Sequence, residues 1–511
     1  FQEIVLSNRG WIHKQTIPIA SKKSKTEQNI VRNYRYIYSG LDDYIKNDIS
    51  NGVLPNKSIQ NIFKSFTKIH FIKIEVESDR KAYEVFITVN SKNDPLTSFD
   101  LTKTLIFKEI DATLDEDNKW AEMEKNINNT QGINPTQFLR YYWVGKYSWA
   151  TDRHLFASIT YAGDNKSIKQ KDEKGKTVLI PVKRTGDERK VFFENLINDL
   201  NDASKVLSNI INLNEQYFID LFGTSGSYGT RIISTLKAIS RFDVKQCYIY
   251  ILALILNAEK TKHNHSQHFD RVPRTVLHIL RKIEIFTFKY QMLAKGLPSA
   301  VENNVYSKLA IEFEEMYTGF NNKNWSNKWT VHRKQNIIKK LDDIIDKYFT
   351  EKELSVSNLV ANIQYQKKQI VRYILEKINQ YTYNQPSDFN YDATLEHILP
   401  QNPKKWKLTK SDVKEYVHSI GNIIYLDSKL NSSLNDASFK DKVNGVSRPK
   451  DDQINRLSDD KTPMNQELFS QLVILLHDDK TWDRALIRER AIKLGEEFNN
   501  AYNTYEETIS S

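Results

Sequence analysis

The sequence contains a single cysteine and no long apolar run, and these two absences exclude whole classes of protein. With Cys247 alone among 511 residues, no disulfide can form within the chain and a cysteine-rich zinc site is disfavoured. The longest apolar run, Cys247 to Leu256, is much shorter than the roughly 18 residues of a membrane span, and it predicts a buried core helix. No secretory signal is visible. We therefore expect a cytoplasmic protein without a membrane partner.

Basic residues outnumber acidic ones, which favours polyanionic partners. The chain carries 74 Lys and Arg against 64 Asp and Glu, with a formal net charge of +10 and a pI of about 9.1. This balance favours nucleic acid, although excess charge also serves solubility. Hydrophobic residues make up 39% and charged residues 27%, which is typical of a globular chain, and the length allows two to four domains.

Residues 1–110 combine strand and helix signals. Apolar and polar residues alternate from Phe66 to Ser78, which predicts a half-buried strand. Further along, the Asn, Asp and Pro of the segment NSKNDP predict a turn, followed by a helix that is capped by Thr97 or Ser98.

Residues 111–350 are predicted to be mostly helical, with an exposed loop or short hairpin at Asp164 to Thr177. Residues 351–511 change character and end in an amphipathic helix for which Thr481 is the expected N-cap. No internal repeat of fixed period is present. We thus predict a mainly α fold with small α+β parts.

The run HNHSQH contains three histidines, His263, His265 and His268, that together resemble a metal-binding cluster. A metal site needs ligands that converge from a folded scaffold, and the spacing H-x-H-x-x-H alone is a weak signal. The better interpretation is a polar loop between helices on a basic face. A loop that contacts the DNA backbone is a second interpretation, because the surrounding positive charge suits phosphates.

A second constellation is better suited to chemistry. A short strand is expected to end at Glu396 and His397, and a second strand to start at Asn422 and lead into a helix from about Ser428 that carries Asn431. Two strands and a helix of this size can bring these side chains around one small pocket.

Each residue type in this constellation suits phosphodiester hydrolysis. His397 has an ordinary pKa near 6.5 and can take a proton from water. The carboxylate of Glu396 and the amide oxygen of Asn431 are hard ligands of the kind that Mg²⁺ prefers. A metal there would stabilise charge on the phosphate and on the leaving 3′ oxygen. The amide of Asn422 could tie the two strands together and hold the backbone at His397.

Other roles remain open for each of these residues. His397 could be a buried histidine, Glu396 a surface residue, and Asn431 a helix cap. Asn422 is more a structural than a chemical residue. Two further residues lie near this constellation in the sequence. His418 is expected to be exposed and incidental, and Asn435 is a weak competitor of Asn431 for the metal.

The pattern EHILPQ, followed by GNIIYL and a later asparagine, resembles the HNH or ββα-metal nuclease motif. More specifically, it resembles the nuclease domain of GmrSD-type, modification-dependent (type IV) restriction endonucleases. Several other segments resemble parts of the same proteins in the same order: AYEVFITVNSKNDPLTSFDLTKTLIF, FLRYYWVGKY, RKIEIFTFKYQMLA, LNSSLNDASFKDKV and TWDRALIRERAIKL. The resemblance therefore covers nearly the whole chain.

The resemblance implies three domains. Residues 1–110 would be the end of a ParB/sulfiredoxin-like nucleotide-binding or sensor domain, residues 111–350 a helical connection, and residues 351–511 an HNH nuclease domain embedded in helices. It also implies double-stranded DNA, in the form of modified phage DNA, as substrate in anti-phage defence. The cofactors that it implies are Mg²⁺ or Mn²⁺, with NTP in the full-length protein, and it is compatible with a homodimer. In this motif His397 and Asn422 would be the catalytic residues, and Glu396 and Asn431 the metal ligands.

Three departures from the family pattern limit what the resemblance implies. The turn at residues 90–93 reads Asn-Ser-Lys-Asn where the family has a glycine in its last position. The Asp-Gly-Gln-Gln-Arg nucleotide motif is absent, and since the chain begins with Phe1 we expect it upstream; without it neither Asn90 nor Lys103 can be assigned to a nucleotide site. Glu396 stands where many HNH enzymes have aspartate.

Three rival functions remain. A phosphorothioate-sensing nuclease similar to SspE, with the same architecture, would nick one strand. A non-catalytic DNA-binding regulator would keep the fold without the chemistry, but the joint presence of Glu396, His397 and Asn431 argues against this. A purely structural helical scaffold would bind no metal and would gain no stability from it.

Overall fold

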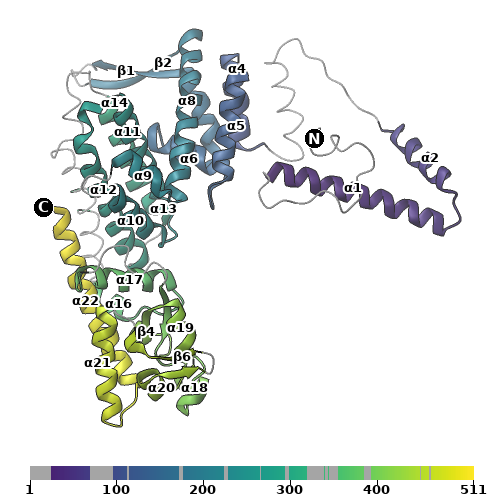
Figure 1. Ribbon diagram of the computed structural model, residues 1–511. Coiled ribbons are helices and arrows are strands. Elements are labelled where there is room, and N and C mark those ends of the chain that lie inside the picture. The colour runs from purple at the N-terminus through teal and green to yellow at the C-terminus, as the bar shows by residue number, and fades with distance from the viewer. Residues whose placement is uncertain are drawn as a thin grey trace. The chain divides into compact units, whose positions relative to one another are not determined.

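The computed structural model describes the chain in segments (Figure 1). These are residues 25–69, 96–111, 114–171, 177–223, 228–264, 266–293, 298–318, 355–384, 393–434, 436–448, 451–459 and 462–510, with the single positions 339 and 343. Within them the fold is mainly helical, with three two-stranded antiparallel sheets, which confirms the predicted mainly α class. No described helix is long and apolar enough to cross a bilayer.

The chain divides into two compact units. The first comprises residues 1–139 and 152–204, and the second residues 140–151 and 205–511. Residues 205–350 of the predicted helical middle thus share one unit with the C-terminal region, whereas residues 111–139 and 152–204 belong to the other. The division at residues 110 and 350 stays a prediction.

The first unit is built from helices and one hairpin. Its elements are α1 (Lys25–Ser50), α2 (Pro55–Phe66), α4 (Ser98–Ile110), α5 (Leu114–Asn128), α7 (Leu155–Asp164), β1 (Asn165–Lys171) and β2 (Thr177–Lys183), with α6 (Pro135–Lys146) and α8 (Gly186–Ile211) continuing into the second unit. β1 and β2 pair antiparallel, which confirms the hairpin alternative for the described residues of the predicted segment, 165–171 and 177. Trp120 is fully buried against Phe99, with ring centroids 4.8 Å apart.

The predicted helix after the turn is confirmed, and Thr97 is its cap. The Thr97 hydroxyl accepts the backbone N–H of Asp100, and the Asp100 carboxylate accepts the N–H of Thr97, forming a capping box. The predicted strand from Phe66 to Ser78 is wrong at its start, because Phe66 is the last residue of α2. Its residues beyond Ile69 lie outside the described part of the chain.

The helical part of the second unit is centred on two buried helices, α11 (Tyr248–Asn264) and α12 (Val272–Thr287). Its elements are α9 (Glu215–Phe222), α10 (Tyr228–Ser240), α11 (Tyr248–Asn264), η4 (Ser266–Arg271), α12 (Val272–Thr287), η5 (Phe288–Leu293), α13 (Pro298–Val301), η6 (Glu302–Ser307), α14 (Lys308–Thr318), α16 (Val356–Ala361) and α17 (Lys368–Tyr381). α11 is buried along its first eleven residues, which confirms the core helix predicted from its apolar run. It ends at Asn264, so His263 lies in its last turn rather than in a loop.

The C-terminal part of this unit surrounds a small ribbon with helices. Its elements are β3 (Ala393–His397), η8 (Lys404–Trp406), α18 (Lys410–Val413), η9 (Ile420–Asn422), β4 (Ile423–Asp427), α19 (Ser428–Leu434), α20 (Phe439–Asn444), β5 (Val446–Arg448), β6 (Asp451–Asn455), η10 (Leu457–Asp459), α21 (Pro463–His477) and α22 (Arg484–Ser510). A buried apolar cluster joins these elements, with Ile424, Leu468 and Trp482 among its members.

Helix α22 closes this part and runs on to the helical middle (Figure 1). It begins at Arg484, and the carboxylate of Asp483 accepts the backbone N–H of Leu486. The helix is therefore capped by Asp483, and the expected cap Thr481 is wrong by two positions. Near its other end, the Tyr502 hydroxyl donates to the carbonyl of Ile285.

Candidate active site

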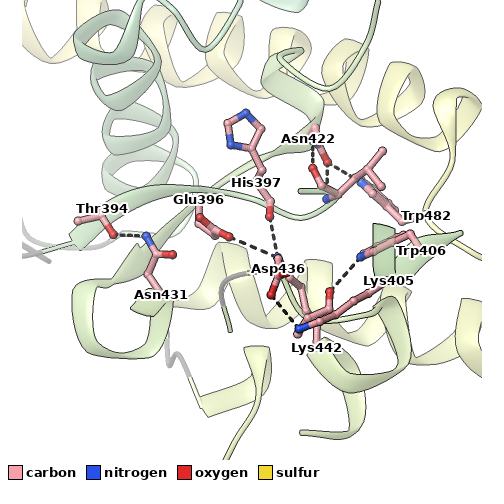
Figure 2. Close-up of polar contacts among 12 residues, drawn as sticks. Thr394, Glu396, His397, Lys405, Trp406, Asn422, Asn431, Asp436, Lys442 and Trp482 are labelled. Atoms are coloured by element: carbon pink, nitrogen blue, oxygen red, sulfur yellow. Dashed lines mark hydrogen bonds and ion pairs between the residues drawn. The ribbon is translucent and has the colours of Figure 1, made fainter. Parts of the chain in front are cut away.

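The candidate site lies on the ribbon of β3 and β4. Glu396 and His397 end β3 and pair across the ribbon with Ile424 and Ile423. Neighbouring residues of a strand point to opposite faces. The carboxylate and the imidazole therefore leave the ribbon on opposite sides, as Figure 2 shows. The strand end, strand start and helix start predicted from sequence are confirmed to within one residue, since β4 begins at Ile423 directly after Asn422.

His397 is buried between two rings on its face of the ribbon. The residue is 4% exposed, the ring centroid of Tyr365 is 4.3 Å away, and Nε2 lies 3.3 Å from Nδ1 of His418. Burial, followed by the charges of His418, Lys442 and Lys368, lowers the pKa of His397 to about 3. The imidazole is thus neutral at neutral pH and has a nitrogen lone pair that can accept a proton.

His418 is a partner of His397, and the expectation that it is exposed and incidental is wrong. It is half-buried, its ring stacks on Tyr365 at an interplanar angle of 14°, and its carbonyl accepts the backbone N–H of Tyr365 at 2.7 Å. These contacts fix the orientation of the histidine pair. The burial that was considered for His397 is observed, whereas its role as a proton acceptor stays a prediction.

Glu396 has a buried lysine for a partner, which the sequence reasoning missed. The Lys442 side chain, on α20, is 1% exposed. Its Nζ donates to the His397 carbonyl at 2.8 Å and lies 3.3 Å from Oε1 of Glu396 (Figure 2). Burial lowers the pKa of Lys442 and raises that of Glu396, because the loss of hydration outweighs the attraction within the pair.

Asn431 joins Glu396 on its face of the ribbon. Thr394 and Glu396 are two residues apart in β3, so they share that face. The Asn431 amide donates to Oγ1 of Thr394 at 2.7 Å, which leaves its oxygen as an acceptor for another group. Asn431 is the fourth residue of α19 and not its N-cap, so the capping alternative is wrong.

Asn422 is completely buried and uses its amide to hold the turn that follows His397. Its Oδ1 accepts the backbone N–H of Leu399 at 2.9 Å and the indole N–H of Trp482 at 3.2 Å. Its Nδ2 donates to the carbonyls of Leu399 and Val417 at 2.9 and 2.8 Å. With all four bonds made inside the protein, Asn422 is a positioning residue.

Helix α22 supports the same turn from behind. Arg490 is buried and its Nη1 donates to the carbonyls of Gly421 and Ile423 at 2.7 and 2.8 Å. A Cβ on Gly421 would lie 1.9 Å from the Ile487 carbonyl oxygen, so only glycine fits where the turn meets the helix. This close approach gives a physical reason for the glycine before Asn422.

The remaining candidates lie away from this site or outside the described residues. Asn90, His265 and Asn435 lie outside them. Lys103 lies in the first unit, where its Nζ is 5.5 Å from the ring centroid of Phe107. His263 is exposed beside Glu259, at 3.9 Å. No group of three or more His, Cys, Asp or Glu that could hold a metal occurs in the described part of the chain.

Comparison with known protein families shows to which family the chain belongs. A model described as GmrSD restriction endonuclease, N-terminal domain, matches residues 2–107, and one described as GmrSD restriction endonucleases, C-terminal domain, matches residues 346–497. The two matches together cover just over half of the chain. The chain belongs to the GmrSD restriction endonuclease family. No curated protein matches it.

Membership of the GmrSD family confirms the resemblance drawn from the sequence motifs. The protein is a restriction endonuclease, a phosphodiester hydrolase that acts on DNA in type IV restriction defence. The C-terminal GmrSD match contains Glu396, His397, Asn422 and Asn431. The ribbon, the helix and their four polar residues are therefore the part of this GmrSD protein in which its chemistry is best sought.

Proposed function

We propose that this protein cleaves modified double-stranded DNA at an HNH centre formed by His397, Glu396 and Asn431, with Asn422 as positioning residue. The observation that carries the proposal is the ββα arrangement itself. It delivers a neutral imidazole, a carboxylate and a free amide oxygen to the end of one short ribbon.

The donor set on the Glu396 face fits a hard divalent cation. It offers one carboxylate and one amide oxygen, and Mg²⁺ commonly binds through one or two protein ligands while keeping several waters. Mn²⁺ accepts the same oxygens. Lys442 already neutralises part of the charge of Glu396, which suits a site that takes a second cation only together with a phosphate anion. Bound there, the ion would supply positive charge against the phosphate and the leaving oxygen.

The roles of the protein's own residues follow from their placement. His397 takes a proton from the attacking water, whose oxygen forms the new bond to phosphorus, and the bond from phosphorus to the 3′ oxygen breaks. The leaving oxygen receives a proton from solvent. His418 and Tyr365 hold the imidazole in place. Since Glu396 and His397 face opposite sides, the scissile phosphate must lie across the end of the ribbon, where both sides are reachable.

We further propose that the N-terminal domain senses the modification and couples nucleotide binding to cleavage. The match of residues 2–107 to the N-terminal GmrSD domain supports this assignment. A phosphorothioate-sensing nickase remains the alternative within the same architecture, and the choice of substrate in the test below separates the two.

The test is relaxation of supercoiled plasmid by the full-length protein with Mg²⁺ or Mn²⁺, with and without NTP, on plain, glucosylated and phosphorothioated DNA. The His397→Ala variant should lose about 10²- to 10⁴-fold in rate, the usual contribution of a general base. His477→Ala is the matched control, because His477 is 89% exposed on α21 and should cleave like the parent.

Each outcome has a defined meaning. Cleavage by the parent and not by His397→Ala supports the HNH centre, and the preferred DNA identifies the modification. Nicked rather than linear product on phosphorothioated DNA supports the alternative. Equal rates for the parent and His397→Ala on every substrate refute His397 as the base.

A further inference from the structure

The second unit contains a large cavity that is separate from the candidate active site. Its volume is about 810 Å³, and its walls come mainly from α9, α10, α12, α17 and β4. Neither His397 nor Glu396 lines it, and none of its walls belongs to residues 1–110. A cavity of this size falls in the range of small-molecule and cofactor sites.

The walls of this cavity are strongly basic. Six cationic side chains line it against three carboxylates: Arg231, Lys237, Arg241, Arg281, Arg372 and Lys377 face Glu215, Asp243 and Glu376. Three of these cations are in ion pairs: Arg241 with Glu376, Lys237 with Glu215, and Lys377 with Glu284, which is buried behind the walls. The lining side chains include three more cations than carboxylates, and Glu284 offsets one of them.

The mutual repulsion of these clustered cations lowers the stability of the folded state. The pKa of Lys377 is lowered first by burial, and the charges of Arg281 and Arg241 lower it further against the pull of Glu284. The pKa of Arg241 is likewise lowered by burial, with Arg372 contributing. An anion in the cavity would relieve this repulsion, and arginine is the side chain best shaped to bind phosphate oxygens.

Aromatic and amide groups line the same cavity. Tyr373, Tyr381 and Tyr425 contribute to its walls, and the guanidinium of Arg372 lies 5.3 Å from the ring centroid of Tyr425. Asn379 is 4% exposed, and its Oδ1 has no hydrogen-bond partner while its Nδ2 donates to the Leu375 carbonyl. Rings that accept stacking and a buried acceptor oxygen suit a nucleobase with its exocyclic N–H groups.

We propose that this cavity binds a nucleotide, with its phosphate on the arginines and its base against the tyrosines. Inorganic phosphate alone would leave most of the volume unfilled, and a DNA duplex is too wide to enter. The nucleotide has two possible sources with the same chemistry: a free nucleotide, or one nucleotide of a single strand that reaches into the cavity.

The cavity is linked to the candidate active site through α17. Lys368 at its start acts electrostatically on His397 and lies 5.0 Å from the ring centroid of Tyr365, which covers His397. Arg372 lines the cavity four residues later, a rise of about 6 Å along the helix. From the other side, Tyr425 pairs in the ribbon with Leu395, the neighbour of Glu396. A ligand in the cavity therefore contacts the two elements that hold the proposed site.

Binding to the full-length protein tests the proposal without relying on cleavage. The probes are ATP, dAMP and the single strand (dT)₆, titrated by calorimetry in the absence of divalent ions. The Arg231→Gln and Arg372→Gln variants should each weaken binding of the preferred probe at least about ten-fold, as expected for a lost charge-assisted hydrogen bond. Arg488→Gln, at an exposed position on α22, should bind like the parent.

A second variant protects the test against misfolding of the arginine variants. Ser234 is half-buried and lines the cavity, so Ser234→Glu adds a negative charge there while keeping every arginine of the walls, and it should also abolish binding. Binding of ATP or dAMP identifies a free nucleotide, and binding of (dT)₆ alone identifies a strand. The proposal is overturned if no probe binds. It is also overturned if the probes bind equally to Ser234→Glu and to the parent, which is the result expected when the nucleotide binds only in the N-terminal domain. The proposal and the HNH centre can fail independently, because His397→Ala leaves this cavity intact.

Discussion

Replacing Asn422 by alanine should show whether this residue holds the turn after His397 in place or takes part in the chemistry itself. The alanine variant removes an amide that makes four hydrogen bonds in a fully buried position. It leaves two N–H donors without partners, the backbone of Leu399 and the indole of Trp482, and it deprives two carbonyls of a donor. The cavity left behind is lined by these polar groups.

The magnitude follows from those orphaned donors. A buried donor that loses its partner costs about 1–3 kcal/mol, so two of them cost roughly 2–6 kcal/mol. We expect the free energy of unfolding of the second unit to fall by about 2–6 kcal/mol, a large part of the usual 5–15 kcal/mol of a domain. Cleavage should be lost as well, because the turn after His397 is released.

Urea unfolding gives the global effect, and hydrogen exchange at the Leu399 amide gives the local one. Asn431→Ala is the matched control, since Asn431 is half-buried and makes a single bond to Thr394. It should cost less than about 1.5 kcal/mol and still abolish cleavage. If Asn422→Ala is as stable as the parent, or if Leu399 keeps its protection, the positioning role assigned to Asn422 is refuted.

Three further predictions concern the supports of the site. Gly421→Ala should prevent correct folding, because its Cβ would overlap the Ile487 carbonyl, whereas Gly186→Ala has open space and should fold normally; circular dichroism and yield decide this. Arg490→Met should lower the free energy of unfolding by roughly 2–4 kcal/mol, since two charge-assisted bonds to carbonyls are lost, and unchanged urea midpoints would contradict it. Hydrogen bonds from Lys493 and then Tyr383 lower the pKa of Glu467. The ionised carboxylate therefore stabilises the fold above its unfolded pKa of about 4.3, and this stabilisation is lost as pH falls from that value through the lowered pKa of the folded state. Glu467→Gln should therefore be less stable than the parent at pH 7, by less than about 1 kcal/mol because the pair is exposed, and the difference should shrink and then vanish as pH falls through the lowered pKa of Glu467.

Local sequence patterns were sufficient to place the elements of the site. The alternation before His397, the glycine before Asn422 and the polar start of α19 each depend on a few neighbouring residues, and the structure places them within one residue of expectation. The cap of α22 was misplaced because Thr481 and Asp483 are both good N-cap residues, and only the first helical turn decides between them.

Features that depend on tertiary contacts could not be predicted in this way. Lys442 looks like an ordinary solvated lysine of a short polar helix, and its burial follows from the carboxylate and the carbonyl that the ribbon brings to it. His418 looked incidental because its partner lies 21 residues earlier in the chain. The basic cavity draws its arginines from helices more than 100 residues apart, so no window of sequence contains it.

The same contacts imply that the HNH motif is not a self-sufficient ββα unit in this protein. The turn between the two halves of the motif is held by Trp482, by Arg490 and by the backbone at Ile487, all of which follow the motif by more than 50 residues. Helix α22 continues from there to pack Phe498 against Phe288, 5.2 Å between ring centroids, in the helical middle. Helix α22 thus contacts both the turn after His397 and the helical middle of the second unit, which contains the basic cavity. Because a helix is stiff over this length, a displacement of the helical middle would also displace the turn after His397. This gives the cavity and the nuclease centre a second physical connection besides α17.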